Sequence, residues 1–439
     1  MKIYHWLEKD FKRRVFFAVL MTGFISTATV LLVFAASEQN TLQENIIKLL
    51  MRQDSLTSTA RVQQFTNERE RNDGVVSSEK GKNLKIEKRI PAWKLLLEDF
   101  QTKATFYDPE GHYIPRLLEE LATTEIKNIS TMRRGTQLKF WIHFVDGNQA
   151  IAKPMRDPKD LYITYDTSTS YLMERERHTA EIAAFHLDRI FDFRRVPPCT
   201  GRLLNFTSEI IMKTNDRSLL HTQTTKDGNQ CFVGKCRWTF LCNESALTCA
   251  KGGLLEVSVC QAIPNLAEVK DYWYRWKTLF DRSENQLRRD CENVKKEAVF
   301  NGHNFDLDFF EAVAFDHLTV NQDRHHYKIL KSNTTDAVGL SLLDNGKGFG
   351  NPLVDDPTFL LPFKICCRFR NSTYWKFKEF TKPDQMLGDQ MRASLAQDPI
   401  NPVLTNDFFP ALDRRLSQIL SELDRCIKKF GRDVVLLED

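Results

Sequence analysis

Residues 321–330 read NQDRHHYKIL and place an acid, a guanidinium, two imidazoles and a phenol in five consecutive positions, Asp323 to Tyr327. Clustered histidines are typical of metal sites, because neutral imidazole is a common metal ligand. A catalytic loop and an ordinary polar turn explain the same composition. The surrounding chain helps to decide, since a helical apolar pattern over 305–318, FDLDFFEAVAFDHL, runs directly into the stretch.

Upstream, residues 135–154, GTQLKFWIHFVDGNQAIAKP, have the pattern of a β-hairpin. Apolar and polar residues alternate along its first half, and residues 146–148, DGN, supply the turn. Lys153 closes the second strand. The following segment ERERHTAEIAAFHLDRIF predicts a helix with Glu176 and Glu181 near its start.

Downstream, VGLSLL (338–343) predicts a short buried strand, and DNGKGFGNP follows at once, so Asp344 lies where the strand ends. Each feature alone has an ordinary explanation. A lysine after a hairpin is usually solvated, a glutamate in a first helical turn usually interacts with the helix dipole, and Asp-Asn-Gly is usually a turn. Their order along the chain is what indicates a function.

That order is the one in which kinase-like folds deliver the parts for phosphoryl transfer from a nucleotide. The reaction needs a Lys on the phosphates, a helix Glu that holds it, an Asp that accepts the proton of the attacking hydroxyl, and metal-binding carboxylates. Two features depart from ordinary protein kinases. No G-x-G-x-x-G loop precedes the hairpin, and the catalytic loop reads Asp-Arg-His-His where protein kinases have His-Arg-Asp.

At these residues the chain resembles the Golgi kinases of the secretory pathway, a family with a xylosylkinase branch, a casein-kinase branch and a pseudokinase. The matching motifs are GTQLK, ERHTAEIAAFHLDRI, NQDRHHY, LDNGKGFGNP, CCRFRNSTY, DPINPVL and FGRDVVLLED, and they span roughly residues 130–439 in order. FGNP, DPINPVL and VVLLED are more similar to the xylosylkinase branch. The resemblance implies an α+β, bilobal and atypical protein-kinase-like fold that is stapled by disulfides.

The resemblance also implies roles for individual residues. Asp323 would be the catalytic base, with Asn321 in the same loop, and Glu181 would be the partner of Lys153. Glu176 and Asp344 would hold the divalent metal, Mn²⁺ or Mg²⁺. The residues that would contact ATP are Gln137, Lys153, Asp344 and the hinge residues Cys260, Gln261, Ala262 and Ile263. His325 and His326 would then shape the loop or help to bind acceptor, and they would not bind metal.

Four positions depart from the family pattern. Lys328 stands where active relatives carry a Glu near the nucleotide, and Val320 and Val257 each replace a usual Gly. Glu176 stands where the xylosylkinase branch has Asp, and either carboxylate can ligate a hard cation. These changes are expected to alter nucleotide affinity more than reaction type.

The function that the resemblance implies is ATP-dependent phosphorylation of the 2-hydroxyl of xylose in the glycosaminoglycan–protein linkage region of proteoglycans. Two alternatives stay open, a Golgi kinase for Ser in secreted proteins and a pseudokinase that activates a relative. A homodimer, or a heterodimer with a relative, is a possible assembly. Nucleic-acid binding is not expected, because a net charge of +4 with 27% charged residues gives no electrostatic support for it.

Residues 16–36 contain 21 uncharged positions, enough to span a bilayer, and Lys12, Arg13 and Arg14 before them favour a cytosolic N-terminus. A cleaved signal peptide is the alternative. We therefore expect a cytosolic tail (1–15), a transmembrane signal-anchor (16–36), a lumenal stem (37–92), an N-lobe with insertions (93–258), and a hinge and helical C-lobe (259–439). The expected location is the Golgi membrane, as a single-pass type II protein with a lumenal catalytic domain.

Cysteines and glycosylation sequons fit a lumenal compartment. Four of the ten cysteines crowd into CFVGKCRWTFLCNESALTC (231–249) and predict two local disulfides, with three pairings open and a zinc site as the alternative. The family resemblance implies the pairs Cys231–Cys249, Cys236–Cys242, Cys291–Cys366 and Cys367–Cys426, and it leaves Cys199 and Cys260 free. The five sequons are at Asn128, Asn205, Asn243, Asn333 and Asn371.

Overall fold

The structure is a computed structural model, and it describes residues 90–103, 105–108, 111–132, 137–162, 176–233, 247–263, 267–268, 291, 299–300, 303–304, 306–321, 323–324, 328–331 and 338–438. All of these belong to one compact unit, Lys88–Asp439. The predicted membrane segment, 16–36, lies outside them. Among the helices that are described, none is long and apolar enough to cross a membrane.

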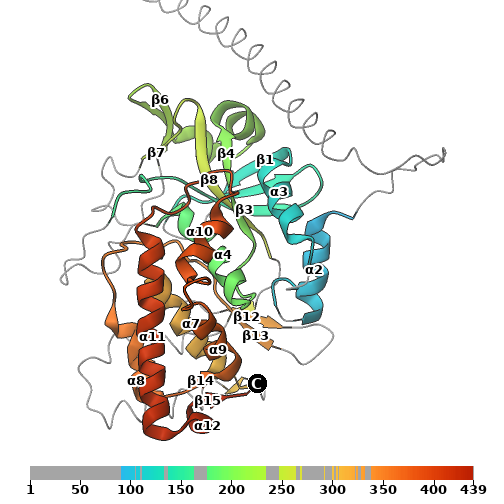
Figure 1. The fold of residues 1–439 in the computed structure, drawn as a ribbon. Helices are drawn as coiled ribbons and strands as arrows, with labels where there is room; N and C mark the ends of the chain where they lie inside the picture. The colour runs from blue at the N-terminus through green and yellow to red at the C-terminus, as the bar shows by residue number, and fades with distance from the viewer. Residues whose placement is uncertain are drawn as a thin grey trace, which may run out of the picture. The chain divides into compact units, whose positions relative to one another are not determined.

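A five-stranded antiparallel sheet forms the first half of this unit, in the order β1-β2-β3-β8-β4 (Figure 1). Its strands are β1 (Ile126–Thr131), β2 (Phe140–Phe144), β3 (Gln149–Pro154), β4 (Cys199–Asn205) and β8 (Leu254–Gln261). The predicted hairpin is confirmed as β2 and β3. Its turn is possible because Gly147 adopts a φ of 91°, and Asp146 Oδ1 accepts a hydrogen bond from the Asn148 backbone N–H.

Helix α4 (His178–Phe191) packs against β4 and β8, and most of its residues are buried. The predicted helix starts later than its sequence pattern indicates, because Arg177 is in an extended conformation (φ −109°, ψ 128°). The Arg177 backbone N–H donates to the Gly346 carbonyl oxygen at 2.6 Å, so a distant loop uses the group. Glu176 therefore lies just before the helix, and Glu181 lies in its first turn.

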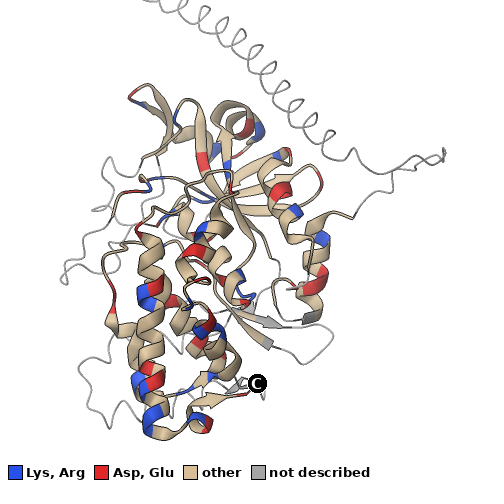
Figure 2. Ribbon diagram, in the orientation of Figure 1, with Lys and Arg blue, Asp and Glu red and all other residues tan. Residues whose placement is uncertain are grey.

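The second half is mainly helical and surrounds α7 (Asp306–Thr319), the helix expected before the NQDRHHYKIL stretch. The long amphipathic helix α11 ends at Phe430, and Gly431 follows it with a φ of 87°, as the sequence pattern predicts. Figure 2 shows acidic and basic residues interspersed along α11. The helices of this half for which the structure describes both ends are α7, α8 (Leu361–Cys366), α9 (Asn371–Glu379), α10 (Leu387–Leu395), α11 (Phe408–Phe430) and α12 (Arg432–Val435).

Smaller elements complete the described fold. In one three-stranded sheet, of order β13-β12-β9, β12 begins within the NQDRHHYKIL stretch, β13 follows it and β9 precedes it. Another sheet, β5-β6-β7, belongs to the first half. The predicted strand 338–343 is shorter, as β13 (Val338–Ser341). The remaining elements are α2 (Ala92–Lys103), α3 (Ile114–Thr123), η2 (Phe206–Ile210), η3 (Ile211–Lys213), α5 (Arg217–His221), β5 (Gln223–Lys226), β6 (Asn229–Val233), β7 (Leu247–Cys249), β9 (Ala267–Glu268), β10 (Val299–Phe300), β11 (His303–Asn304), β12 (Lys328–Lys331), η7 (Pro357–Leu360), β14 (Phe369–Arg370) and β15 (Leu436–Leu437).

The segment DPINP, 398–402, joins the helical half to the edge strand β4. The Asp398 carboxylate accepts hydrogen bonds from Thr200 Oγ1 at 3.1 Å and from the Gly201 backbone N–H at 3.0 Å. A Cβ at Gly201 would lie 2.2 Å from Ile400 Cγ1, so this close approach requires glycine. Lys159 Nζ also donates to the Ile400 carbonyl at 2.6 Å. The edge of the sheet is thus covered by a segment from the C-terminal part of the chain.

The structure contains disulfides at Cys231–Cys249, Cys291–Cys366 and Cys367–Cys426, the pairs that the resemblance implies. Cys236 and Cys242 lie outside the described residues. The expectation that Cys199 and Cys260 are free is wrong, because the two are joined in a disulfide. They are directly opposite partners on β4 and β8, with their Cα atoms 4.0 Å apart.

Three of the predicted sequons can be placed. Asn128 lies in β1, Asn205 caps η2 by accepting from the Thr207 and Ser208 backbone N–H groups, and Asn371 is the first residue of α9. Asn243 and Asn333 lie outside the described residues. Glycosylation at these sites stays a prediction.

His186 predicts a specific pH dependence of stability. It joins α4 to α10 through a 2.6 Å hydrogen bond between its Nδ1 and Ser394 Oγ, and burial lowers the pKa of this histidine to about 3. A histidine in the unfolded chain has a pKa of about 6.5, so between about pH 6.5 and about pH 3 it binds a proton that the folded state does not bind. Stability from this residue is thus present above about pH 6.5 and is lost as the pH falls toward 3.

When the pH falls from about 7.5 to about 5, we expect the free energy of unfolding to decrease less in His186→Gln than in the wild type. The two decreases should differ by about 1–2 kcal/mol. Urea unfolding followed by fluorescence at both pH values measures this difference. Equal pH dependence in the two proteins would show that His186 does not remain neutral in the folded state.

Candidate active site

Lys153 at the end of β3 is the centre of a cluster of carboxylates. Its Nζ lies 2.5 Å from Glu181 Oε1, 2.5 Å from Asp344 Oδ1 and 3.5 Å from Glu176 Oε2. Lys139, directly before β2, adds a second cation, with its Nζ 3.5 Å from Asp344 Oδ2. Lys139 belongs to the predicted hairpin, but no role was predicted for it. Three residues that were predicted for the site, Glu176, Glu181 and Asp344, therefore surround the ammonium group of Lys153, which was also predicted.

The charges in this cluster stabilise one another. Burial alone would lower the pKa of Lys153, but the surrounding carboxylates of Asp344, Glu181 and Glu176 raise it well above its usual value. Lys153, followed by Lys139, holds the pKa of Asp344 well below its usual range. Both groups are consequently charged at neutral pH. The site thus presents a fixed cation beside carboxylates, which suits phosphate and metal binding.

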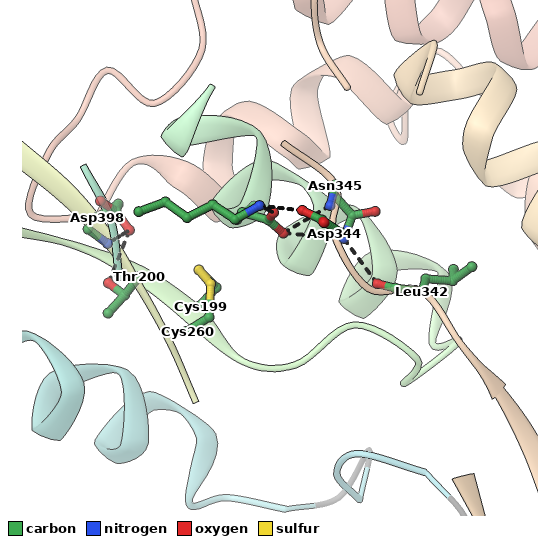
Figure 3. The surroundings of a disulfide bond; sticks show 10 residues. Cys199, Thr200, Cys260, Leu342, Asp344, Asn345 and Asp398 are labelled. Carbon is green, nitrogen blue, oxygen red and sulfur yellow. Dashed lines mark hydrogen bonds and ion pairs between the residues drawn. A yellow bond between two sulfur atoms is a disulfide. The ribbon is translucent and has the colours of Figure 1, made fainter. Parts of the chain in front are cut away.

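The DNGKG turn fits against this cluster because it contains glycine. A Cβ at Gly346 would lie 3.1 Å from Lys153 Nζ and 3.2 Å from Glu176 Oε2. Asp344 adopts a φ of 59°, a left-handed conformation that Asp tolerates better than most residues. The Asn345 backbone N–H donates to Glu181 Oε2 at 3.2 Å. Figure 3 shows Asp344 and Asn345 at this turn. Helix α4 therefore fixes both Lys153 and the turn that carries Asp344.

Asp323 lies in a second cluster, separate from the contacts of Lys153. Its Oδ2 is 2.8 Å from Lys347 Nζ, and its backbone N–H donates to Asn321 Oδ1 at 3.1 Å. Lys347 is 8% exposed and comes from the same turn as Asp344. Lys347 lies within the DNGKGFGNP motif, and its role was not predicted because nothing along the chain relates it to Asp323. One turn thus supplies groups to both clusters.

Arg324 connects the loop that carries Asp323 to helix α7 and to the DNGKG turn. This guanidinium donates to both Asp316 carboxylate oxygens on α7, and its Nη2 lies 2.5 Å from Asn345 Oδ1. It also donates to the Leu343 carbonyl. Val320 has a φ of 52°, which is strained for a β-branched residue and explains why a glycine suits this position. Arg324 was not predicted as a site residue.

The predicted hinge begins with Cys260 and Gln261, the last two residues of β8. The Gln261 side chain exchanges hydrogen bonds with Asn148 at 3.1 and 2.8 Å, and the Ala262 backbone N–H donates to the Gln149 carbonyl at 3.1 Å. The side chain of Gln261 is thus used to hold the hinge. Ile263 is the last described residue of this segment.

The other predicted or departing positions lie on nearby elements. Gln137 does not contact the Lys153 cluster through a described bond; its Oε1 accepts from Arg156 Nη1 at 2.6 Å. Val257 lies in β8 between Pro154 and Arg202 of the neighbouring strands. Lys328 begins β12, opposite Ser341 of β13. His325 and His326 lie outside the described residues, so their predicted role stays a prediction.

The residues present fit a hard divalent cation that is shared with phosphates. Within the described part of the chain no group of three or more His, Cys, Asp or Glu residues could enclose a metal by itself. The carboxylates of Glu176 and Asp344 both lie near Lys153 Nζ. Gly346 has no side chain beside Glu176, where a Cβ would lie 3.2 Å from Glu176 Oε2. Mg²⁺-like ions are usually held by one or two carboxylates with substrate phosphates and water completing the shell. Such an ion would suit this pair.

The chain is similar to a known protein family and to individual members of it. The family described as "Golgi casein kinase, C-terminal, Fam20" matches residues 92–435. The human extracellular serine/threonine protein kinase FAM20C is 35% identical over 76% of this chain and 57% of its own length. The human glycosaminoglycan xylosylkinase is 34% identical over 76% of this chain and 80% of its own length.

A crystal structure of the Golgi casein kinase with Mn/ADP bound superposes with a TM-score of 0.68 at 30% identity, and the match covers 79% of this chain and 83% of that one. The fold is therefore that of a kinase of this type. The chain spans little more than half of the first relative and four fifths of the second.

Proposed function

Because the chain belongs to the Fam20 family of Golgi casein kinases, we propose that it is an ATP-dependent kinase that phosphorylates the 2-hydroxyl of xylose in the linkage region of proteoglycans. The observation that carries the kinase assignment is the arrangement of Lys153 between Glu181 and Asp344, with Asp323 held separately by Lys347. Phosphoryl transfer needs a cation and metal-binding carboxylates at the phosphates, and a separate carboxylate that accepts the proton of the attacking hydroxyl.

In this proposal Glu181 holds Lys153 so that its ammonium group can contact ATP phosphates. Glu176 and Asp344 hold Mn²⁺, which neutralises phosphate charge when it is bound. Asp323 accepts the proton of the acceptor hydroxyl as that oxygen bonds to the γ-phosphorus, and the bond to the β-phosphate oxygen breaks to release ADP. The hinge, Cys260 to Ile263, receives the base. The Mn/ADP complex of the Golgi casein kinase supports the choice of nucleotide and metal.

The xylose acceptor is supported by the xylosylkinase relative and by the FGNP, DPINPVL and VVLLED motifs. The protein-kinase relative is equally similar, so serine in secreted proteins is the second candidate. The purified lumenal part, with ATP and Mn²⁺, should label a galactose–xylose linker fragment and leave a Ser-x-Glu peptide unlabelled. Label on the peptide alone would refute the xylosylkinase proposal. No label on either acceptor, in wild type as in Asp323→Asn, would favour a pseudokinase that activates a relative.

We also propose a Golgi location with a lumenal catalytic domain, anchored by residues 16–36, and association with itself or a relative as a dimer. The secretory names of the relatives support the location. The four disulfides in the described part of the chain suit an oxidising lumen.

Lys347 gives a prediction for the second cluster. Removing its charge in Lys347→Met is expected to lower kcat by about tenfold or more, because Asp323 loses the group that orients it. The KM for ATP should change little, since the Lys153 cluster is intact. Lys347→Arg keeps the cation and should retain most of the rate. Steady-state kinetics on the linker fragment test this, and equal losses in the two variants would contradict an electrostatic role.

A further inference from the structure

The Cys199–Cys260 disulfide has a position that distinguishes it from the other described disulfides. It joins edge strand β4 to β8 at the residue where β8 becomes the hinge. The next residue, Gln261, donates its backbone N–H to the Pro198 carbonyl at 2.9 Å, and Pro198 directly precedes Cys199. A covalent bond and a hydrogen bond therefore act together on the first two hinge residues.

The strand register places this disulfide on the face of the sheet from which Lys153 reaches Asp344. Lys153 pairs with Ser258, and Ile151 pairs with Cys260. Residues two apart on a strand point to the same face, and directly opposite residues lie side by side. Cys260 and Ile151 thus lie one step from Lys153 along the same face. The disulfide and the Asp344–Asn345 turn appear together in Figure 3.

The burial of these residues differs in an informative way. Cys199 is buried, at 1% exposed, whereas Cys260 and Ile151 are only partly buried. The disulfide therefore joins a core residue, Cys199, to a less buried residue of the site face, Cys260. A disulfide beside an aliphatic side chain is apolar and polarisable, which suits contact with a planar base.

We propose that the Cys199–Cys260 disulfide is a nucleotide-positioning element, which forms part of the surface against the base and holds the hinge in its binding conformation. This rests on the proposed kinase function. Without the disulfide, β8 would be held to β4 at this point by backbone hydrogen bonds alone. The hinge would keep its hydrogen bonds to Asn148 and Gln149, but nucleotide binding would have to supply the part of its ordering that the disulfide now provides. Such a loss of preorganisation weakens affinity without removing any charged group.

The first test compares two matched disulfide removals. Cys231–Cys249 also joins directly opposite residues of adjacent strands, with the same 4.0 Å Cα separation, but it lies in the β5-β6-β7 sheet. The double variant Cys199→Val with Cys260→Val should raise the Kd for Mn·ADP by about tenfold in calorimetry. Cys231→Val with Cys249→Val should stay within about twofold of wild type, because its sheet does not carry the hinge. Equal affinities in all three proteins would overturn the proposal.

The second test uses the wild-type protein and does not depend on the folding of a variant. A phosphine reductant is added with and without Mn·ADP, and free thiols are alkylated and mapped by mass spectrometry over time. Bound nucleotide should slow reduction of Cys199–Cys260 several-fold and leave Cys231–Cys249 unchanged. Unchanged reduction of both in the presence of bound Mn·ADP would overturn the proposal. Failure of the wild type to bind Mn·ADP at all would instead refute the proposed function.

Discussion

Replacing Asp323 by Asn is expected to lower kcat by about 10²–10⁴-fold and to leave the Kd for Mn·ADP within about threefold of wild type. The reason is that Asp323 contacts Lys347 and the Asn321 side chain, and none of its described contacts is to the Lys153 cluster. Loss of the carboxylate therefore removes the proton acceptor and keeps the groups proposed to hold phosphates and metal. Asn has nearly the same shape and still offers an oxygen to Lys347, so the loop should keep its conformation.

Single-turnover phosphorylation of the linker fragment and calorimetry with Mn·ADP measure the two quantities separately. Asp344→Asn is the informative comparison, since it removes a carboxylate of the Lys153 cluster and should reduce both rate and nucleotide affinity. Asp389→Asn, on the exposed side of α10, controls for the substitution itself and should change neither. Loss of ADP affinity in Asp323→Asn as large as that in Asp344→Asn would refute the assignment of Asp323 as the base.

Local sequence signals predicted the hairpin well, because alternation, a DGN turn and a terminal lysine all agree over residues 135–154. The contact between Lys153 and Glu181 was also expected, and the structure contains it at 2.5 Å. These features depend on neighbours in the chain or on the order of a few motifs. The start of α4 was predicted less well. The Arg177 backbone is held in an extended conformation by Gly346, which is far away in the sequence.

The features that the sequence did not reveal are those that depend on strand register and turn geometry. Cys199 and Cys260 are 61 residues apart, and only the pairing of β4 with β8 makes them neighbours. Lys347 meets Asp323 because the DNGKG turn folds back toward the end of α7. Nothing near Arg324 in the sequence relates it to Asn345, so the sequence did not mark it as the residue that joins this turn to the helix.

Replacing Lys153 by Met is expected to abolish measurable phosphorylation and to destabilise the protein by about 3–5 kcal/mol near neutral pH, since the removal of one partner leaves buried charge unpaired. Glu181 is buried, and it would face Asp344 and Glu176 without the ammonium group that now contacts all three. Asp344 is about half exposed, at 47%, so water screens its share of this cost. Most of the loss should therefore come from Glu181.

The sign of the pH dependence separates this explanation from a simple packing defect. Lys153 lowers the pKa of Asp344, so that pair contributes stability above the ordinary carboxylate pKa and loses it as the pH falls. In Lys153→Met the carboxylates repel one another and take up protons at higher pH, so the difference from wild type should shrink between about pH 7.5 and about pH 5. Urea unfolding at both pH values measures it, with Lys251→Met, on an exposed turn, as control. A difference that stays constant with pH would mean that lost packing, and not unpaired charge, causes the destabilisation.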